Sequence, residues 1–278
     1  MPELLFEKHD DIAVVTFNRP ERRNAITPEM IVRLYDAWIA FREDERLRVA
    51  ILTGAGHDAF SAGADLARLI PLLTKARPPE DDWDRRLLAD RSIFQGAILR
   101  RFELFKPIIA AVNGTTLAGA TEMMQATDLR FAVPEATFGL SEPKRGLVPG
   151  GGSLVRLARQ IPYCKAMEIL LTGEPMSAEE ALRIGLYHEV VPDGTDGPGL
   201  AAQARGAALA RELADGPQFG LQMTKEMLHR EATMDLASAI EAEAQAQALC
   251  MRSPDFSEAN FAFVQKRSPV FRKPGTPA

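Results

Sequence analysis

Two short apolar runs, each followed by a glycine, constrain the fold of this chain more than any other feature. Residues 49–53 are largely apolar up to Gly54, and residues 108–112 are apolar up to Asn113-Gly114. Continuous apolar runs of this length are typical of strands that are buried on both faces, as in parallel sheets. Segments with helical spacing lie between and after these runs. The pattern therefore indicates an α/β protein rather than an all-helical one.

Weaker local signals predict the elements around these strands. Residues 4–8 and 12–17 are apolar-rich and flank Asp10-Asp11, which predicts a strand, a turn and a strand. Thr27-Pro28 is typical of a helix start, with Thr as the cap and Pro in the first turn. Residues 200–266 are rich in Ala, Leu, Glu and Gln. That region is predicted to be helical, with breaks at 215–217 and 253–254.

The chain is predicted to divide near residue 198. Residues 193–199 contain three glycines and a proline, which is the most linker-like composition in the chain. The division gives a core at 1–198 and a helical region at 199–278. Residues 66–106 are charged and contain prolines, and they form a candidate lid.

Composition excludes several classes of protein. The chain has 278 residues and a net charge of −5, which argues against a nucleic-acid surface. Its longest dense apolar run is too short to cross a bilayer, and its first residues lack the apolar stretch of a secretory signal. Two cysteines cannot make a disulfide framework, and the four histidines share no metal-ligand spacing. We expect a protein of the cytoplasm, without nucleic-acid or membrane partners and without a metal.

Two glycine-rich segments that follow predicted strands could offer backbone amides to an oxygen atom. They are residues 54–66 and 113–122. In the second, small residues open a helix, so its unpaired amides and positive dipole end favour a developing oxyanion. The first also matches a dinucleotide fingerprint through Gly54, Gly56 and Ala59. No helix is predicted directly after it and no strand-end acid follows about twenty residues on, so the context that the motif requires is missing.

Two carboxylates near these segments are candidates for proton transfer. Glu122 lies in the first turn of the small-residue helix, where an acid commonly only compensates the helix dipole. Glu142 precedes a second glycine run at 150–152 and could be an ordinary loop acid. If both reached one apolar pocket, they could hold a water molecule and move two protons.

Taken together, these motifs resemble the crotonase (enoyl-CoA hydratase/isomerase) superfamily over essentially the whole chain. The matching segments are FNRPERRNA at 17–25, AFSAGAD at 59–65, AAVNG at 110–114 with Gly119 and Glu122, FGLSE at 138–142, Pro149-Gly150 and FVQKR at 263–267. The resemblance implies an α/β fold built as a spiral of ββα units, followed by a helical C-terminal oligomerisation region. It also implies a homotrimer or a dimer of trimers.

The same resemblance implies which residues form the site. The oxyanion-hole amides would belong to Ala64 and Gly119, and the catalytic acids would be Glu122 and Glu142. Residues expected to bind coenzyme A are Arg22, Ala62, Asp65, Leu66, Phe263 and Lys266, the last two reaching a neighbouring subunit's ligand. No metal or redox cofactor is expected, because coenzyme A is part of the acyl-CoA substrate.

The resemblance implies an enoyl-CoA hydratase that adds water across the 2,3 double bond of a trans-2-enoyl-CoA. An enoyl-CoA isomerase or another acyl-CoA enzyme of the same fold is the enzymatic alternative, and a non-catalytic binding protein is the other. The family commonly has three glycines where this chain has Ala118-Gly119-Ala120. Since the oxyanion donors are backbone amides, the hole is expected to survive that departure. Residues 121–130 resemble hydratases of bulky acyl groups.

Overall fold

In the described part of the chain ten strands form two sheets, and from β3 to β8 successive strands alternate between them. The computed structural model describes residues 1–192 and 199–271. One sheet has the order β1-β2-β3-β5-β7-β10 and the other the order β4-β6-β8-β9. The strands are β1 (Leu4–His9), β2 (Ile12–Phe17), β3 (Val49–Gly54), β4 (Ala59–Ser61), β5 (Ile108–Val112), β6 (Thr115–Leu117), β7 (Leu129–Ala132), β8 (Thr137–Gly139), β9 (Met176–Ser177) and β10 (Glu189–Val190).

The helices lie between and after these strands. They are α1 (Pro28–Glu43), α2 (Leu69–Leu73), α3 (Asp82–Ala89), α4 (Arg91–Ala97), α5 (Gly119–Gln125), α6 (Ser153–Gln160), α7 (Tyr163–Thr172), α8 (Ala178–Arg183), α9 (Leu200–Ala214), α10 (Gln218–Glu231), α11 (Leu236–Cys250) and α12 (Pro254–Val264), with short 3-10 helices at Pro20–Arg22 and Pro143–Arg145. The cap predicted for α1 is present, because the Thr27 side chain accepts a hydrogen bond from the Met30 amide.

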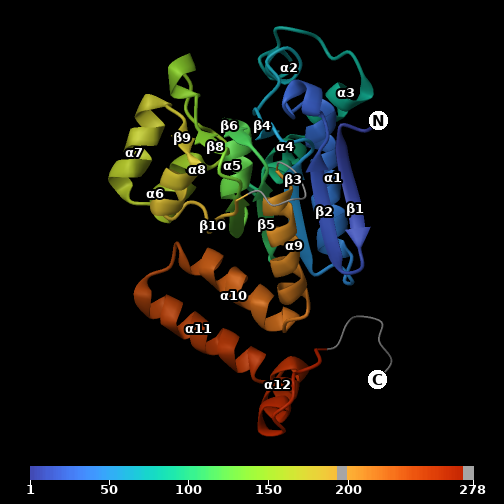
Figure 1. Cartoon of the computed structure of the whole chain (residues 1–278), viewed down its shortest axis with the longest axis vertical. Coiled ribbons are helices and arrows are strands. Elements are labelled where there is room, and N and C mark those ends of the chain that lie inside the picture. Colours follow the sequence, from blue (N-terminus) through green and yellow to red (C-terminus); the bar gives the residue numbers. More distant parts are fainter. Residues whose placement is uncertain (193–198, 272–278) are drawn as a thin grey trace.

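Successive ββα units build the molecule. The pairs β3/β4, β5/β6 and β7/β8 each place one strand in each sheet before the chain continues into helices. Strands β3, β5 and β7 pair in parallel, and so do β4, β6 and β8. This arrangement confirms the predicted α/β spiral of ββα units (Figure 1).

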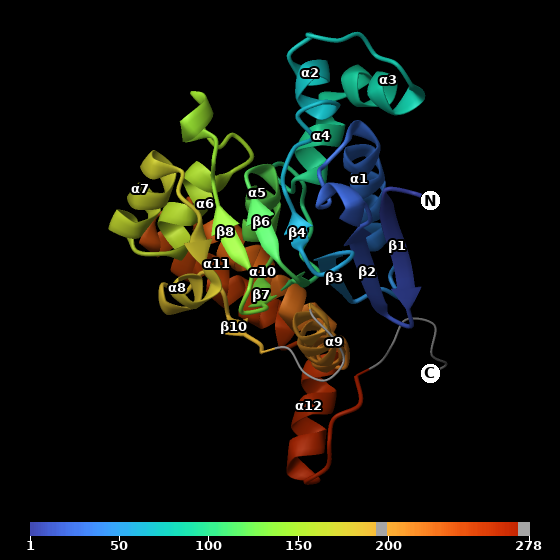
Figure 2. The same cartoon turned by 45° about the horizontal axis from the view of Figure 1, so that its top comes forward.

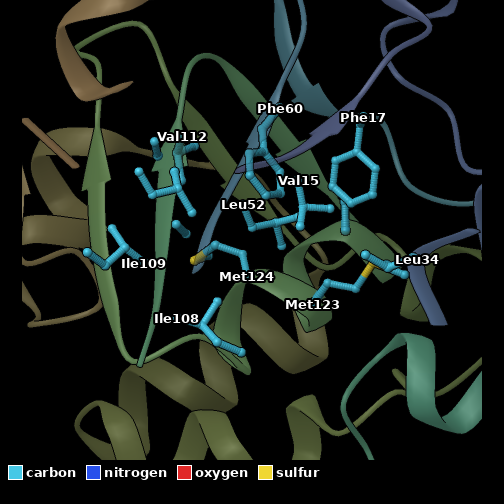
Figure 3. Close-up of a cluster of buried hydrophobic side chains, with 14 of the residues drawn as sticks. Val15, Phe17, Leu34, Leu52, Phe60, Ile108, Ile109, Val112, Met123 and Met124 are labelled. Atoms are coloured by element: carbon cyan, nitrogen blue, oxygen red, sulfur yellow. The ribbon is translucent and has the colours of Figure 1, made fainter. Parts of the chain in front are cut away.

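The core lies where the two sheets and α5 meet. Every residue of β3 and β5 is buried, as their continuous apolar sequences predict. Figure 3 shows Met123 and Met124 of α5 among side chains of β2, β3 and β5. The buried residues of α5 pack against this core, and this packing fixes the position of the first turn of the helix.

Helix α9 packs directly on the larger sheet. Its buried residues are Ala202, Gly206, Ala210 and Ala214, a stripe of small residues spaced by four. A side chain at Gly206 would begin 3.5 Å from Ile109 of β5, so the small stripe lets the helix approach the strands closely. The predicted linker at 193–198 lies outside the described residues, and the division at 198 stays a prediction. The packing of α9 groups it with the core sheet.

Helices α10, α11 and α12 lie below the sheets in the view of Figure 1, and α12 projects clear of them in Figure 2 as well. Helix α10 still reaches the larger sheet, because Lys225 donates to Lys106 O and pairs with Asp128 beside β5 and β7. The predicted helical breaks at 215–217 and 253–254 are confirmed. The sequence analysis was wrong in expecting one uninterrupted helix between them, because the chain breaks at 232–235. There Asp235 caps α11 by accepting a hydrogen bond from the Ser238 amide at 3.0 Å.

The candidate lid at 66–106 contains α2, α3 and α4. Asp84 of α3 is fully buried and pairs with Arg77, whose hydrogen bonds to its side chain keep the pKa of Asp84 below the usual range. Its closure as a lid stays a prediction. Within residues 1–192 and 199–271, no helix is both long and apolar enough to cross a membrane.

Candidate active site

The first turn of α5 is fastened to the ends of two strands in the smaller sheet. The Thr121 hydroxyl donates to Thr116 O at 3.0 Å and to Gly139 O at 2.9 Å. The Ala118 amide also donates to Gly139 O, at 2.8 Å. These bonds tie the start of α5 to β6 and β8. The amide of Gly119 therefore has a fixed position and direction.

The loop at 61–65 lies against this helix start. Gly63 has φ +84°, and a side chain there would begin 2.7 Å from Leu117 O and 3.4 Å from the Gly119 amide nitrogen. Around Ala64, the Ile26 amide donates to Gly63 O and the Asp65 amide donates to Ile26 O. Within the described residues, the amides of Ala64 and Gly119 donate to no protein acceptor. The structure thus brings the two predicted oxyanion donors onto neighbouring loops with both N–H groups available.

Glu122 is 6% exposed and is held by backbone amides of the glycine run. Its Oε1 accepts hydrogen bonds from the Gly151 amide at 2.7 Å and the Ser153 amide at 3.2 Å. Burial raises the pKa of Glu122, while these amides and the charge of Arg156 act in the opposite direction. The carboxylate is therefore a buried, oriented group rather than a solvated acid that only compensates the helix dipole.

Glu142 lies at the start of the same loop and interacts electrostatically with Glu122. Burial raises the pKa of Glu142, and the negative charge of Glu122 raises it further. Its Oε2 atom is buried and has no hydrogen-bond partner in the described part of the chain. Two neighbouring carboxyls with raised pKa values are suited to share acid and base roles near neutral pH.

Four of the residues predicted to bind coenzyme A lie on two paired segments. Ile26 and Ala64 form a parallel bridge, which brings the segment containing Arg22 beside the segment that contains Ala62, Asp65 and Leu66. Arg22 and Leu66 are exposed.

Asp65 has its own side-chain contacts. It accepts hydrogen bonds from the Ala67 and Arg68 amides and pairs with Arg19 at 3.0 Å. These contacts shape the loop that carries Ala64.

Phe263 and Lys266 do not join this cluster within one chain. Phe263 lies in the last turn of α12 and Lys266 follows the end of that helix, and α12 is remote from α5 in both views (Figures 1 and 2). Phe263 is 85% exposed.

As its sequence context predicted, the segment that matches the dinucleotide fingerprint does not lead directly into a helix. Strand β4, not a helix, follows Gly56, and the Gly54 amide donates to the Asn113 side chain at 3.1 Å. No group of three or more His, Cys, Asp or Glu residues that could hold a metal ion occurs among residues 1–192 and 199–271.

The sequence analysis missed Gly151, Ser153 and Arg156 as site residues. Gly151 and Ser153 donate to Glu122, and Arg156 donates to Gly151 O at 3.2 Å. The glycine run at 150–152 was noticed, but nothing in the sequence showed that it packs on a carboxylate some thirty residues earlier. The local signal in the sequence is a glycine run directly before a helix that carries Arg156 in its first turn.

Comparison with known proteins gives a consistent result. The model of the enoyl-CoA hydratase/isomerase family matches residues 7–274. The chain is 37% identical to enoyl-CoA hydratase EchA19 of Mycobacterium tuberculosis, covering 98% of this chain and 97% of that protein. It is also 37% identical to (E)-benzylidenesuccinyl-CoA hydratase of Thauera aromatica, covering 98% and 99%. A crystal structure of enoyl-CoA hydratase from Mycobacterium tuberculosis has a TM-score of 0.84 and 34% identity, covering 98% of this chain and all of that one.

Proposed function

The chain belongs to the enoyl-CoA hydratase/isomerase family, and we propose that it hydrates a trans-2-enoyl-CoA to a 3-hydroxyacyl-CoA. It is an enzyme of the hydratase type. The observation that carries the proposal is the pair of electrostatically coupled carboxyls, Glu122 and Glu142, beside two backbone amides without protein acceptors. Hydration needs a base for water, an acid for carbon and donors for the thioester oxygen, and this arrangement offers all three.

In the proposed mechanism, the amides of Ala64 and Gly119 donate to the thioester carbonyl oxygen. Charge that builds up on this oxygen is stabilised by about 3–4 kcal/mol for each such donor in comparable sites. Glu122 takes a proton from water as the water oxygen bonds to C3. Glu142 holds that water and delivers its own proton to C2. The proton on Glu122 then passes to the Glu142 carboxylate, which restores both groups, so one water is added and no oxidant, reductant or metal is needed.

The raised pKa of Glu142 supports its role as the acid, because a carboxyl that keeps its proton closer to neutral pH can donate it. Burial also raises the pKa of Glu122, but two amide hydrogen bonds and the charge of Arg156 oppose that rise, which suits Glu122 to act as the base.

Coenzyme A is proposed to lie along the segments that contain Arg22, Ala62, Asp65 and Leu66. Two observations support this placement: Arg22 and Leu66 are exposed, and the bridge between Ile26 and Ala64 brings their segments side by side. Phe263 and Lys266 are proposed to contact the coenzyme A of a neighbouring subunit. The coenzyme enters as part of the substrate, and we propose no separate cofactor.

We also propose a homotrimer or a dimer of trimers built through α10–α12. These helices expose many large apolar side chains, namely Leu228, Leu236, Ile240, Leu249, Phe256, Phe261, Phe263 and Val264. A groove of about 590 Å³ between α10 and α11 is lined by Met223, Met227 and Ile240. Apolar surface of this extent is typical of an oligomer interface. We place the enzyme in the cytoplasm, where its two free cysteines, Cys164 and Cys250, would stay reduced.

The test is hydration of crotonyl-CoA, followed by the loss of the conjugated thioester absorbance. Glu122→Gln and Glu142→Gln should each reduce kcat by at least about a hundredfold, with little change in KM. The double variant should lose much less than the product of the two effects, because both acids serve one transition state. An isomerase would depend on Glu142 but hardly on Glu122, and wild-type protein without hydratase activity would refute the proposal. A parallel assay with (E)-benzylidenesuccinyl-CoA tests whether bulky acyl groups are preferred.

A further inference from the structure

The side chain of Arg156, in α6, forms hydrogen bonds with three separate segments, one of which contains Glu122. Its guanidinium donates to Leu99 O at 2.6 Å, to Gly151 O at 3.2 Å and to Glu122 O at 3.5 Å. Within the described residues its contacts are backbone carbonyls, and no carboxylate pairs with it. Arg156 is half-buried, so its charge loses hydration that no carboxylate partner replaces, and this is costly to the fold. This cost points to a role for Arg156 in the neighbouring site that contains Glu122.

Two adjacent glycines make room for this arrangement. A side chain at Gly152 would begin 2.5 Å from Arg156 Nη1, and a side chain at Gly151 would begin 2.6 Å from Glu122 Oε2. Gly151 also donates its amide to Glu122 Oε1 at 2.7 Å while its carbonyl accepts from Arg156. The loop is thus packed between a cation on one side and a carboxylate on the other.

We propose that Arg156 is a positioning residue for Glu122: it fixes the Gly151 peptide against the carboxylate and supplies the positive charge nearest to it. This inference rests on the proposed function of Glu122 as the base that activates water. A base must be ionised to accept a proton, and a neighbouring positive charge favours the ionised form of a carboxyl. Arg156 itself would not touch the substrate.

The electrostatic environment supports this role. Burial raises the pKa of Glu122, and the charge of Arg156 counteracts that rise. Burial lowers the pKa of Arg156, and Glu122 counteracts that change in turn. Other charged or titratable groups face this cluster: the charge of Arg100 lowers the pKa of Arg156, the charge of Arg156 lowers the pKa values of His229 and Arg130, and the charge of Glu122 raises that of Glu142. Because the charge of Glu122 raises the pKa of Glu142, the titrations of the two carboxyls must be assigned separately.

The test compares Arg156→Gln with Arg156→Lys and a control, Arg159→Gln. Arg159 lies on the same helix, is exposed and donates only to Val155 O, at 2.9 Å. In Arg156→Gln we expect the acidic limb of the pH profile of kcat/KM to move up by about one pH unit, the lower end of the effect of an adjacent opposite charge. Activity on that limb should fall about tenfold. KM should stay within about twofold of wild type, because the coenzyme A contacts are untouched.

The conservative variant separates charge from geometry. Arg156→Lys should restore the position of the acidic limb but not the full kcat, because one ammonium group cannot hold three carbonyls as the planar guanidinium does. Arg159→Gln should leave both unchanged. Arg156→Met, which keeps the aliphatic stem, provides a second neutral variant, and circular dichroism establishes the fold of each protein.

A measurement without substrate distinguishes failure of this inference from failure of the proposed function. Glutamate carboxyl carbons are titrated by NMR in wild type and in Arg156→Gln, with Glu122 assigned by the signal missing in Glu122→Gln. The Glu122 pKa should be higher in Arg156→Gln even if the enzyme hydrates no enoyl-CoA. An unchanged Glu122 titration, or an equal shift in Arg159→Gln, would overturn the role of Arg156.

Discussion

Gly151→Ala is the sharpest test of how the Glu122 carboxylate is held. The added methyl carbon would lie 2.6 Å from Glu122 Oε2 and 2.8 Å from its carboxyl carbon. Ordinary contacts between such atoms begin near 3.5 Å, so the carboxylate must retreat by about 1 Å. Because the amides of Gly151 and Ser153 come from the same loop, this movement also weakens both hydrogen bonds to Oε1.

The expected loss is mainly catalytic. A displacement of about 1 Å at a reacting group can cost about a hundredfold in rate, and loss of general-base catalysis costs about a hundredfold to ten-thousandfold. We therefore expect kcat for crotonyl-CoA hydration to fall by about a hundredfold or more, with KM nearly unchanged. Overpacking of this kind costs about 1–3 kcal/mol of unfolding free energy. The melting temperature should fall by a few degrees.

Gly150→Ala is the matched control. The nearest atom to a side chain there is Val148 O at 3.9 Å, which is an ordinary contact. Its kcat should stay within about twofold of wild type, since nothing needs to move. If Gly151→Ala kept wild-type kcat, the carboxylate position seen here would not matter for turnover. If both variants lost activity equally, general loop disturbance would explain the result.

Four further predictions follow from single features of the structure. Gly119→Ala should melt like wild type, because no atom lies within 4 Å of the new methyl, yet lose kcat/KM if the thioester occupies that space. Ala118→Gly should stabilise the fold by about 1 kcal/mol and raise Tm by about 2–4 °C, since Ala118 has φ +50°; an unchanged Tm would contradict this. Lys266→Ala should raise KM for acyl-CoA most at low salt, because salt screens an exposed phosphate contact, and an unchanged KM would remove Lys266 from the site. A chain ending at Gly216 should scatter light as a monomer or an aggregate, and a persisting trimer would contradict assembly through α10–α12.

The fold was predictable where a local signal determines a local structure. The apolar runs at 49–53 and 108–112 are buried strands, and Thr27 caps a helix as expected. The break at 232–235 was missed because it contains no glycine or proline and depends on Asp235 as a cap. Which surface a helix packs against is harder still to predict. The Ala-rich composition after residue 199 predicted helix, but only the four-residue spacing of small side chains in α9 indicates close packing on a sheet.

The candidate site was predictable for residues that family motifs mark, but not for those that orient them. Glu122 and Glu142 were identified as candidates, and the structure places them in one electrostatic environment. Arg156 was missed because its contacts are backbone carbonyls in segments far apart in the sequence. A side chain that binds backbone leaves no paired residue in the sequence to indicate its role.

Three glycines show how a site made of backbone groups can still be traced in a sequence. Gly63 has a positive φ and lies against the start of the segment that contains Gly119, so any larger residue there would strain the backbone and clash. Gly119 has open space beside it, so no contact within the chain requires a glycine there, and the room suits a ligand. At Gly151 the Glu122 carboxylate occupies the space of a side chain, so glycine is required there because of a residue 29 positions earlier. Because these causes differ, alanine at Gly63 should disturb the fold, alanine at Gly119 the binding of substrate and alanine at Gly151 the base. Alanine substitution at these three positions therefore distinguishes an effect on the fold, an effect on substrate binding and an effect on the base.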